Sequence, residues 1–161
     1  MGTPVTYTYI PSLSRTVRIE GFWPLPCGSF PPPPPPPLIW PPKDPTDTLD
    51  YVVDFADAIT SDQGDAIATL DITISPDQPG DLTLVKSTGD GTLAILWLTA
   101  GFAGTTYNVN VAIGTNSGRT LGRTVQLPVV TLAIPPTQPN DLETQTDAVI
   151  TDQNGQPITT S

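Results

Sequence analysis

Pairs of aspartates spaced three residues apart are the feature of this sequence most capable of chemistry. The pairs are Asp44 and Asp47, Asp54 and Asp57, and Asp62 and Asp65. Two carboxylates can hydrolyse a glycosidic bond when they face each other across a cleft that holds a sugar. These pairs fall on the outward face of a predicted strand or in loops, and so small a domain leaves little room for a deep pocket. We therefore predict no catalytic residues and no enzymatic activity.

Ligands for a metal ion and reactive thiols are also scarce. The sequence has no histidine, which removes the commonest general base and transition-metal ligand. Acidic segments at Asp62–Asp65 and Asp90–Ile95 lack the Asp-x-Asp-x-Asp-Gly spacing of a calcium loop, and a weak surface calcium site remains an alternative. The single cysteine, Cys27, cannot form an intramolecular disulfide and is interpreted as a buried or incidental thiol. We expect no cofactor and no metal.

The charge balance and the hydropathy exclude further classes of partner. Sixteen acidic and six basic residues give a net charge of −10, which disfavours non-specific binding to nucleic acid or anionic lipid. No apolar run has the length of a signal peptide or the roughly 20 residues of a membrane span. The sequence therefore predicts a soluble protein, made in a cytoplasm, that binds neither nucleic acid nor membrane.

Three regions of different composition predict a folded body between two extensions. Residues 1–42 contain 13 of the 21 prolines and are interpreted as an extended anchoring arm. Residues 43–131 are rich in alternating apolar and polar residues and are interpreted as the folded domain. Residues 132–161 are polar and contain proline, which is typical of an extended tail.

The folded domain contains six short segments whose residues alternate or are apolar throughout, as strands do. Turn formers separate these segments, which predicts an antiparallel β-sandwich of the immunoglobulin or fibronectin type III kind. One segment, Thr92–Leu98, is apolar on both faces and is predicted to be central or covered on both sides. A short helical turn is expected within Asp54–Ala68. The predicted strands are Thr48–Phe55, Ala68–Ile74, Asp81–Lys86, Thr92–Leu98, Thr105–Ile113 and Arg119–Val130.

Seven consecutive prolines lie in the arm between Phe30 and Trp40. Proline fixes φ and lacks a backbone donor, so the run is predicted to form a polyproline II rod of about 22 Å. We interpret it as a spacer that holds the sandwich away from the anchoring residues, with recognition by an SH3-like or WW-like domain as the alternative. The spacer residues are Pro31, Pro32, Pro33, Pro34, Pro35, Pro36 and Pro37.

Alternating segments and aromatic residues make the arm a candidate for binding a partner. Val5–Ile10 and Arg15–Glu20 are predicted to add strands to a partner's sheet, and the aromatic side chains to fill partner grooves. In a second interpretation, Trp40 docks with Ile39 on the sandwich and fixes the exit angle of the rod. The sandwich is expected to fold without the arm. The candidate contacts are Val5, Tyr7, Tyr9, Trp23, Phe30 and Trp40.

The tail ends in a pattern that favours a β-hairpin. Asn154 and Gly155 form a strong hairpin-turn signal, and the apolar residues Val149, Ile150 and Ile158 flank them. A hairpin this short is marginal in water by itself. We therefore interpret these five residues as a clip that orders on a neighbouring protein, with a disordered tail as the alternative.

Tyr107 lies at the start of an alternating strand, in the segment Ala103–Val111. Its Gly-Thr-x-Tyr-x-Val pattern resembles the tyrosine corner of immunoglobulin-like domains. In that feature the tyrosine hydroxyl bonds to a backbone group a few residues upstream. The resemblance implies a structural role for Tyr107 rather than a catalytic one.

The start and end of the folded domain resemble small immunoglobulin-like virion proteins of tailed bacteriophages, the fibre–tail adaptors. The motifs that carry the resemblance are Lys43-Asp44-Pro45, Leu49-Asp50-Tyr51, Asp54-Phe55, Ala103–Tyr107 and Gly118–Thr120. They cover a little over half of the chain, and the long proline run departs from the family's pattern.

This resemblance implies a structural protein of the phage particle, made in the host cytoplasm and located in the virion at the tail or capsid surface. Its implied partners are other virion proteins, namely the fibre and the tail, collar or portal-proximal proteins, with the copies arranged in a symmetric ring. A capsid decoration or head-fibre protein is the first alternative. A carbohydrate-binding or adhesion module is an alternative of another class.

Overall fold

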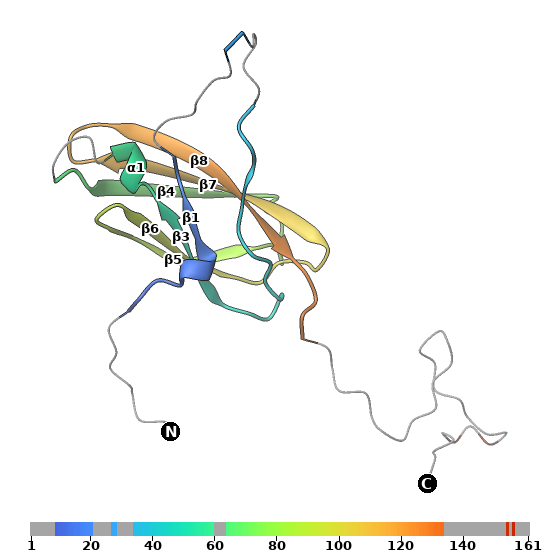
Figure 1. The fold of residues 1–161 in the computed structure, drawn as a ribbon. Coiled ribbons are helices and arrows are strands. Elements are labelled where there is room, and N and C mark those ends of the chain that lie inside the picture. Colours follow the sequence, from blue (N-terminus) through green and yellow to red (C-terminus); the bar gives the residue numbers. More distant parts are fainter. Residues whose placement is uncertain are drawn as a thin grey trace, which may run out of the picture.

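Two β-sheets packed face to face form the body of the protein in a computed structural model (Figure 1). The structure describes residues 9–20, 27–28, 34–59, 64–133, 154 and 156. The helical elements are the 3-10 turn η1 (Leu13–Arg15) and α1 (Ala56–Ile59). The strands are β1 (Thr16–Arg18), β2 (Leu38–Ile39), β3 (Leu49–Asp54), β4 (Ile67–Ser75), β5 (Thr83–Asp90), β6 (Leu93–Thr99), β7 (Thr105–Thr115) and β8 (Thr120–Val129).

Each sheet has four strands, in the orders β1-β3-β6-β5 and β2-β8-β7-β4. The two pairings between domain strands in each sheet are antiparallel, whereas β1 runs parallel to β3 and β2 runs parallel to β8. The predicted β-sandwich is therefore confirmed, and its sheets are mixed because the arm supplies a parallel edge strand to each. The orders β3-β6-β5 and β4-β7-β8 match B-E-D and C-F-G of an immunoglobulin fold. The immunoglobulin-like assignment stays a prediction that this order supports.

Strand β7 illustrates how alternation places the core. Tyr107, Val109 and Val111 are buried between the sheets, whereas Asn108 and Asn110 between them are exposed. Side chains of a strand point alternately to its two faces, so one apolar set faces inward along the whole strand. The same period in β3, β4 and β8 places their apolar residues in a common layer.

Strand β6 is central in its sheet, between β3 and β5, as its apolar sequence predicted. Its residues Leu96 and Leu98 point into the core and are fully buried. Ile95 is also buried although it does not belong to the core cluster. On Trp97, further along β6, the ring of Tyr9 packs with a centroid separation of 5.8 Å. Both faces of the strand are thus covered, which accounts for its unbroken apolar run.

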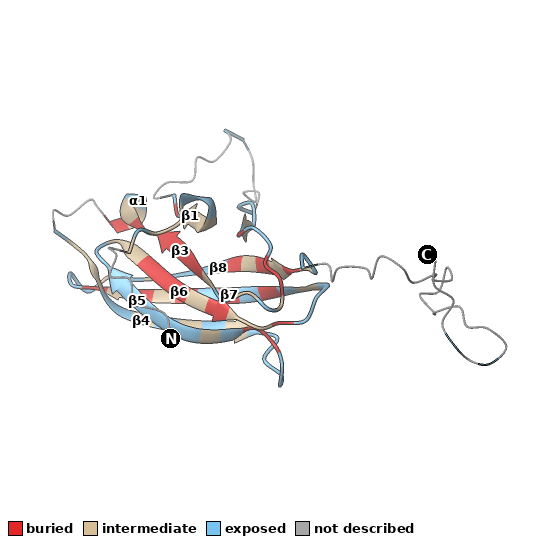
Figure 2. Cartoon of the chain, turned by 90° about the horizontal axis from the view of Figure 1, so that it is seen from below, coloured by how far each residue is buried: buried red, intermediate tan, exposed pale blue. Residues whose placement is uncertain are grey.

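The hydrophobic core lies between the sheets, where the buried residues of β3, β6, β7 and β8 face one another (Figure 2). Fully burying an aliphatic or aromatic side chain contributes about 1.5–3 kcal/mol, so this layer is the main source of stability. Two of its members come from the arm rather than from the domain. The buried core residues are Ile19, Trp40, Tyr51, Val53, Phe55, Ile59, Leu82, Ala94, Leu96, Leu98, Tyr107, Val109, Val111, Ile113, Val125, Leu127 and Val129.

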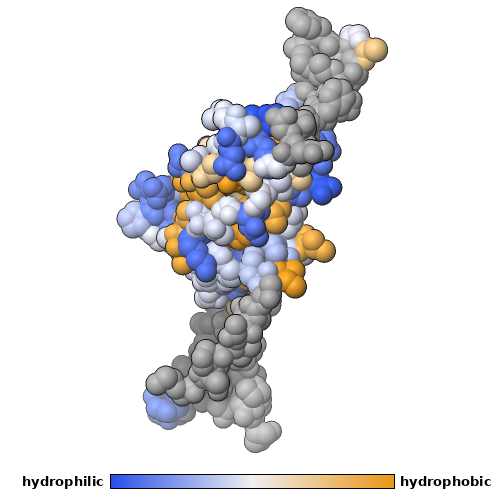
Figure 3. Space-filling view, turned by 90° about the vertical axis from the view of Figure 1, so that its left-hand side faces the viewer, coloured by the Kyte–Doolittle hydropathy of each residue, from blue (hydrophilic) through white to orange (hydrophobic). Residues whose placement is uncertain are grey.

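The outside of the body mixes polar and apolar residues. On the face shown in Figure 3, hydrophobic and hydrophilic atoms occur in separate small patches. Single exposed apolar residues are normal on soluble proteins, so each needs a structural argument before a role is assigned to it. The large hydrophobic side chains that are exposed are Ile10, Leu13, Ile39, Val85, Phe102 and Leu132.

The path of the arm differs from the one predicted. In Figure 1 the described start of the arm (blue) passes through η1 below β1, and the segment that begins at residue 34 descends from above the body. The chain thus runs up along β1 and returns down along β2. The proline run therefore does not separate the body from the residues before it, because residues 9–19 and Trp40 are bound to the same sandwich.

Helical structure is limited to short turns in the described part of the chain. The predicted turn within Asp54–Ala68 is α1, where the amide groups of Ala58 and Ile59 donate to the carbonyl oxygen of Phe55. Among the described residues, we find no helix of sufficient length and apolar character to span a membrane.

Candidate interface

Asp50 fastens the first part of the arm to the body. The hydroxyl of Tyr9 donates to its Oδ2 at 2.7 Å, and Nε of Arg15 donates to its carbonyl oxygen at 2.7 Å. An Arg15 Nη2–Asp50 Oδ1 ion pair completes the contact. Burial by itself would raise the pKa of Asp50, but the hydrogen bonds from Tyr9 and Arg15 lower it. Tyr9, predicted to contact a partner, thus contacts this chain's own sheet, where burial and Asp50 raise its pKa.

Ile19 and the strand before it close the edge of β3. The amide of Ile19 donates to the carbonyl oxygen of Asp54 at 2.8 Å, and the side chain is buried in the core. Arg18 lies 3.3 Å from the carboxylate of Asp54, but its side chain is largely exposed, so the ion pair contributes little. The predicted addition of Arg15–Glu20 to a partner's sheet is wrong at this segment, because β1 adds to the sheet of its own chain.

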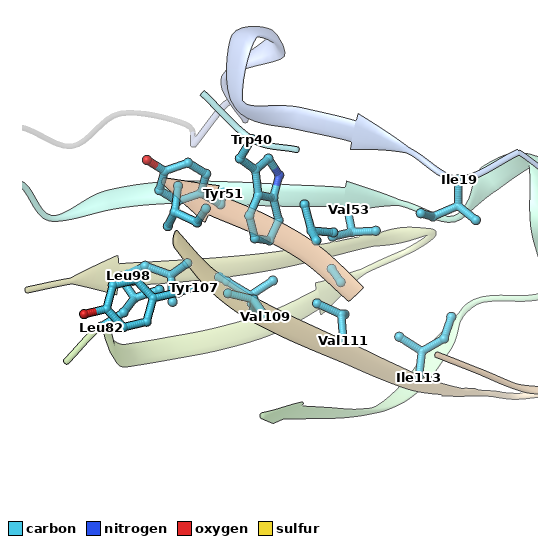
Figure 4. Close-up of a cluster of buried hydrophobic side chains, with 14 of the residues drawn as sticks. Ile19, Trp40, Tyr51, Val53, Leu82, Leu98, Tyr107, Val109, Val111 and Ile113 are labelled. Atoms are coloured by element: carbon cyan, nitrogen blue, oxygen red, sulfur yellow. The ribbon is translucent and has the colours of Figure 1, made fainter. Parts of the chain in front are cut away.

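Trp40 closes the side of the sandwich where β1 and β2 lie (Figure 4). Its side chain is 1% exposed and its ring centroid lies 5.2 Å from that of Tyr51. Its Nε1 donates to the carbonyl oxygen of Val52 at 3.1 Å, and its amide donates to that of Gln126 at 2.9 Å. The predicted partner contact by Trp40 is wrong, because a side chain buried in its own core cannot fill another protein's groove. The geometry agrees with the second interpretation, docking on the sandwich.

Lys43 and Asp44, at the start of the domain, bind the loop after β6 and the start of the tail. The Nζ of Lys43 is buried and donates to the carbonyl oxygens of Asp44 at 2.7 Å and Ala100 at 2.8 Å, and burial lowers its pKa. The Oδ2 of Asp44 accepts the amides of Leu132 at 2.7 Å and Ala133 at 2.8 Å. The tail therefore leaves the body from a fixed point.

Asp65 organises the opposite end of the sandwich. Its carboxylate accepts hydrogen bonds from the amide of Ser117 at 3.1 Å and from its hydroxyl at 2.7 Å. It also forms an ion pair with Arg119 at 2.9 Å. These contacts, led by the Ser117 hydroxyl, lower the pKa of Asp65 to about 2. Asp65 thus joins the loop before β4 to the hairpin between β7 and β8.

Acid is expected to destabilise the protein through these carboxylates. Hydrogen bonds, first among them the amide of Ala133 and then Thr46, hold the pKa of Asp44 well below its unfolded value near 3.8. The pKa of Asp65 is lowered in the same direction. Because the folded state binds protons less tightly than the unfolded state, the contribution of both groups is complete above about pH 4 and is lost as the pH falls toward 2.

Urea unfolding measured between pH 7 and pH 2 checks this expectation. Asp44→Asn and Asp65→Asn should be less stable than the natural protein at pH 7 and should lose less stability on acidification. Equal losses in all three proteins would show that neither carboxylate carries the acid sensitivity.

Tyr107 connects three segments at the end of the body where the tail leaves. Its hydroxyl accepts the amide of Phe102 at 2.9 Å and donates to Oδ1 of Asp81 at 2.6 Å. Burial, followed by the hydrogen bond to Asp81, raises the pKa of Tyr107. A bond to the backbone five residues upstream is what a tyrosine corner has, and this geometry supports the role inferred from the resemblance.

Tyr107→Phe is expected to lower the free energy of unfolding by about 1–3 kcal/mol. The substitution keeps the buried ring but leaves the amide of Phe102 and one oxygen of the buried Asp81 without their partner. Chemical denaturation followed by circular dichroism measures the change. A Tyr107→Phe protein as stable as the natural one would show that the hydroxyl bridge contributes nothing net.

Three of the paired carboxylates make structural contacts within the described part of the chain. Asp44 and Asp65 are bonded as above, and Asp54 accepts the amide of Ala56 at 2.9 Å. A shallow depression of about 350 Å³ lies over Gly114 and Gly122 on the outer face of one sheet, and Asp71 is the one carboxylate that lines it. The two-carboxylate arrangement of a glycosidase is thus not formed by these groups.

Most of the predicted contact residues in the extensions lie outside the described residues. Of the proline run, Pro34–Pro37 are described and exposed. Asn154 is described as part of a turn and is exposed, and Cys27 is an exposed free cysteine. The predicted residues outside the described ranges are Val5, Tyr7, Trp23, Phe30, Pro31, Pro32, Pro33, Val149, Ile150, Gly155 and Ile158.

Sequence reasoning missed the residues that hold the extensions on the body. Asp50 and Arg15 hold the arm, Asp44 binds the start of the tail, and Lys43 binds the loop between β6 and β7. A signal was present for three of them, because Lys43, Asp44 and Asp50 lie in the motifs at the start of the domain. Those motifs indicated a resemblance but not what the charged side chains contact.

Fold and contacts together define a small β-sandwich protein in which residues 9–19 of the arm and residues 132–133 of the tail are fastened to the body. The family model described as podophage GP4 fiber-tail adaptor protein gp77 matches residues 43–128, which is more than half of the chain. The protein belongs to this family of bacteriophage fibre–tail adaptors, as the motifs indicated. No curated protein matches the chain.

Proposed function

We propose that this protein is a non-enzymatic structural component of a phage virion that joins a tail fibre to the tail or collar. The observation that carries the proposal is the family match over residues 43–128, which extends from the Lys43–Asp44 junction almost to the end of β8. The structural contacts made by Asp44, Asp54 and Asp65 agree with it, because these carboxylates serve the fold.

The extensions are the parts we propose to bind the two partners. The tail comprises residues 132–161, and Asp44 holds its first two residues, Leu132 and Ala133. Its apolar residues from Val149 to Ile158 are proposed to clip onto one virion protein. The arm is proposed to reach the other through residues 1–8 and through the proline-rich segment 20–37, which includes Trp23 and Phe30.

We propose that a symmetric arrangement of several copies makes the modest contacts of each arm and tail add up to a stable assembly. If copies of the chain surround the tail axis in a ring, each extension repeats around it, and linked contacts raise the overall affinity far above that of one copy. The net charge of −10 agrees with protein partners rather than nucleic acid.

A phage mutant that lacks this protein tests the proposal. Electron micrographs of the mutant particles should show heads and tails without fibres, and supplying the full chain in trans should restore the fibres. Supplying residues 1–133 should give particles that contain the protein but hold fewer fibres. Mutant particles with a normal number of fibres would contradict the adaptor role. Mutant particles that lack capsid decoration would indicate that the protein is a capsid decoration protein instead.

A further inference from the structure

Phe102 is an aromatic side chain held in an exposed position by a rigid loop. It is 54% exposed, although it lies between the buried β6 and β7. The loop from Ala100 to Gly104 joins these strands at the end of the body where the tail leaves. An aromatic ring in water contributes little to folding, so its position needs another explanation.

The loop that carries Phe102 is fixed by contacts on both sides of the ring. The amide of Phe102 donates to the hydroxyl of Tyr107 at 2.9 Å. The carbonyl oxygen of Ala100 accepts the buried Nζ of Lys43 at 2.8 Å, and the amide of Gly104 donates to the carbonyl oxygen of Val129 at 2.8 Å. Hydrogen bonds at three points leave the loop little freedom to withdraw the side chain.

Backbone strain is present at the same loop. Ala100 has a φ of +61°, the one positive value at a non-glycine residue in the described chain. The left-handed region costs an alanine about 1–2 kcal/mol, and strained residues that persist tend to cluster at functional sites. The burial of Lys43 against the carbonyl oxygen of Ala100 helps to hold this conformation.

The ring of Phe102 lies over Gly80, in the loop between β4 and β5. A Cβ atom placed on Gly80 would lie 2.7 Å from Cζ of Phe102, so an alanine there would push the ring away. Gly80 also has a φ of +92°. The far end of the ring thus rests over Gly80, and more than half of the side chain stays exposed to solvent. Pre-ordering of this kind reduces the entropy that a contact residue loses on binding.

The charges around Phe102 indicate what kind of surface can approach it. Four segments meet at this end: residues 43–48, 76–82, 100–104 and 130–133. They contain four aspartates and one cation. Lys43, Asp44 and Asp81 are buried, so the charges that reach solvent at this end are those of Asp47 and Asp77. A second copy of the chain would bring the same acidic end and a net charge of −10. A surface with basic groups around an apolar pocket is electrostatically complementary.

We propose that Phe102 is an anchor that inserts into an apolar, basic-rimmed pocket of a different virion protein. The inference rests on the proposed function, because that function identifies the partner as a virion protein at the fibre–tail joint. Leu132, exposed beside the point where Asp44 holds the tail, extends the apolar contact toward the tail. Binding energy at protein interfaces concentrates in a few such aromatic residues. The end of the sandwich and the tail that leaves it therefore face the same partner.

Photo-crosslinking in assembled particles tests the proposal directly. A benzophenone-bearing phenylalanine replaces Phe102 in one sample and Val85, which is 56% exposed on β5, in a matched control. After illumination, mass spectrometry of purified particles should find position 102 linked to a virion protein other than this chain. No product at position 102, or a product with a second copy of this chain alone, would overturn the proposal.

A second measurement uses competition for incorporation. Phe102→Ala and the natural protein, supplied together to particles that lack the chain, should be retained in a ratio of about 1:30, the loss expected for an aromatic hot spot. Val85→Ala should be retained as well as the natural protein. Equal retention of Phe102→Ala would overturn the anchor while leaving the adaptor role intact. If the natural protein itself does not enter particles, it is the proposed function that fails.

Discussion

Replacing Trp40 with alanine is expected to lower the free energy of unfolding by about 3–5 kcal/mol. The indole is 1% exposed, packs against Tyr51 and closes the side of the sandwich. Its removal leaves a cavity the size of a large side chain and deprives the carbonyl oxygen of Val52 of its Nε1 donor. A domain of this size is stable by only about 5–15 kcal/mol, so the change takes a large fraction of the total.

Chemical denaturation of a matched set of variants measures this effect. Ile39→Ala is the control, because the neighbouring side chain is 52% exposed and its loss should change stability by less than 1 kcal/mol. Trp40→Phe should fall between the two, since it keeps much of the packing but lacks the donor. If Trp40→Ala unfolds no more easily than Ile39→Ala, the indole is not part of the core.

A chain that begins at Lys43 is expected to lose even more stability than Trp40→Ala and to be unfolded at 37 °C. The truncation removes Ile19 and Trp40 from the core together with β1 and β2. It also exposes the edges of β3 and β8, which then present unpaired backbone groups to water or to other chains. This reverses the expectation that the sandwich folds without its arm.

Circular dichroism and thermal unfolding of three chains check this result. Residues 9–161 keep every described contact of the arm and should fold like the full protein. Residues 1–133 keep the body and the Asp44 junction and should also fold. A chain of residues 43–161 that unfolds cooperatively at the same temperature as the full protein would mean that the arm only decorates the body.

The sequence predicted the domain strands well and one turn badly. Alternation placed β3, β4, β7 and β8 within a few residues of their bounds, because one face of each is buried along its length. The glycines of Ser87–Gly91, between the predicted strands Asp81–Lys86 and Thr92–Leu98, indicate a turn. Instead β5 continues to Asp90 and pairs Gly89 with Ala94, so cross-strand pairing overrides the low strand propensity of glycine.

The arm could not be placed from the sequence for a physical reason. The pairing of Thr16 with Val52 and of Leu38 with Val125 is parallel and joins residues far apart in the chain. No hairpin turn announces such a pairing, so a strand that adds to a partner's sheet and one that adds to its own look alike. The burial of Trp40 could not be predicted for the same reason, because it depends on whether β2 joins a sheet of its own chain or of a partner.

The contacts of the extensions depend on details that side-chain type does not reveal. In the sequence Asp44 is half of a carboxylate pair, but in the structure it accepts the amides of Leu132 and Ala133. Tyr107 was predictable because its motif includes its own hydrogen-bond partner a few residues away. The sequence therefore predicts hydrogen bonds between residues close in the chain, whereas contacts between distant segments are found only in the three-dimensional structure.

Cryo-electron microscopy of the intact phage particle tests the central claim most directly. The account predicts density for the β-sandwich at the joint between tail and fibre, repeated around the tail axis. The arm and the C-terminal tail of the chain should contact two different proteins there. The end of the sandwich that carries Phe102 should face the protein that the C-terminal tail contacts. Density for the sandwich on the capsid lattice, or its absence from the particle, would contradict the adaptor function.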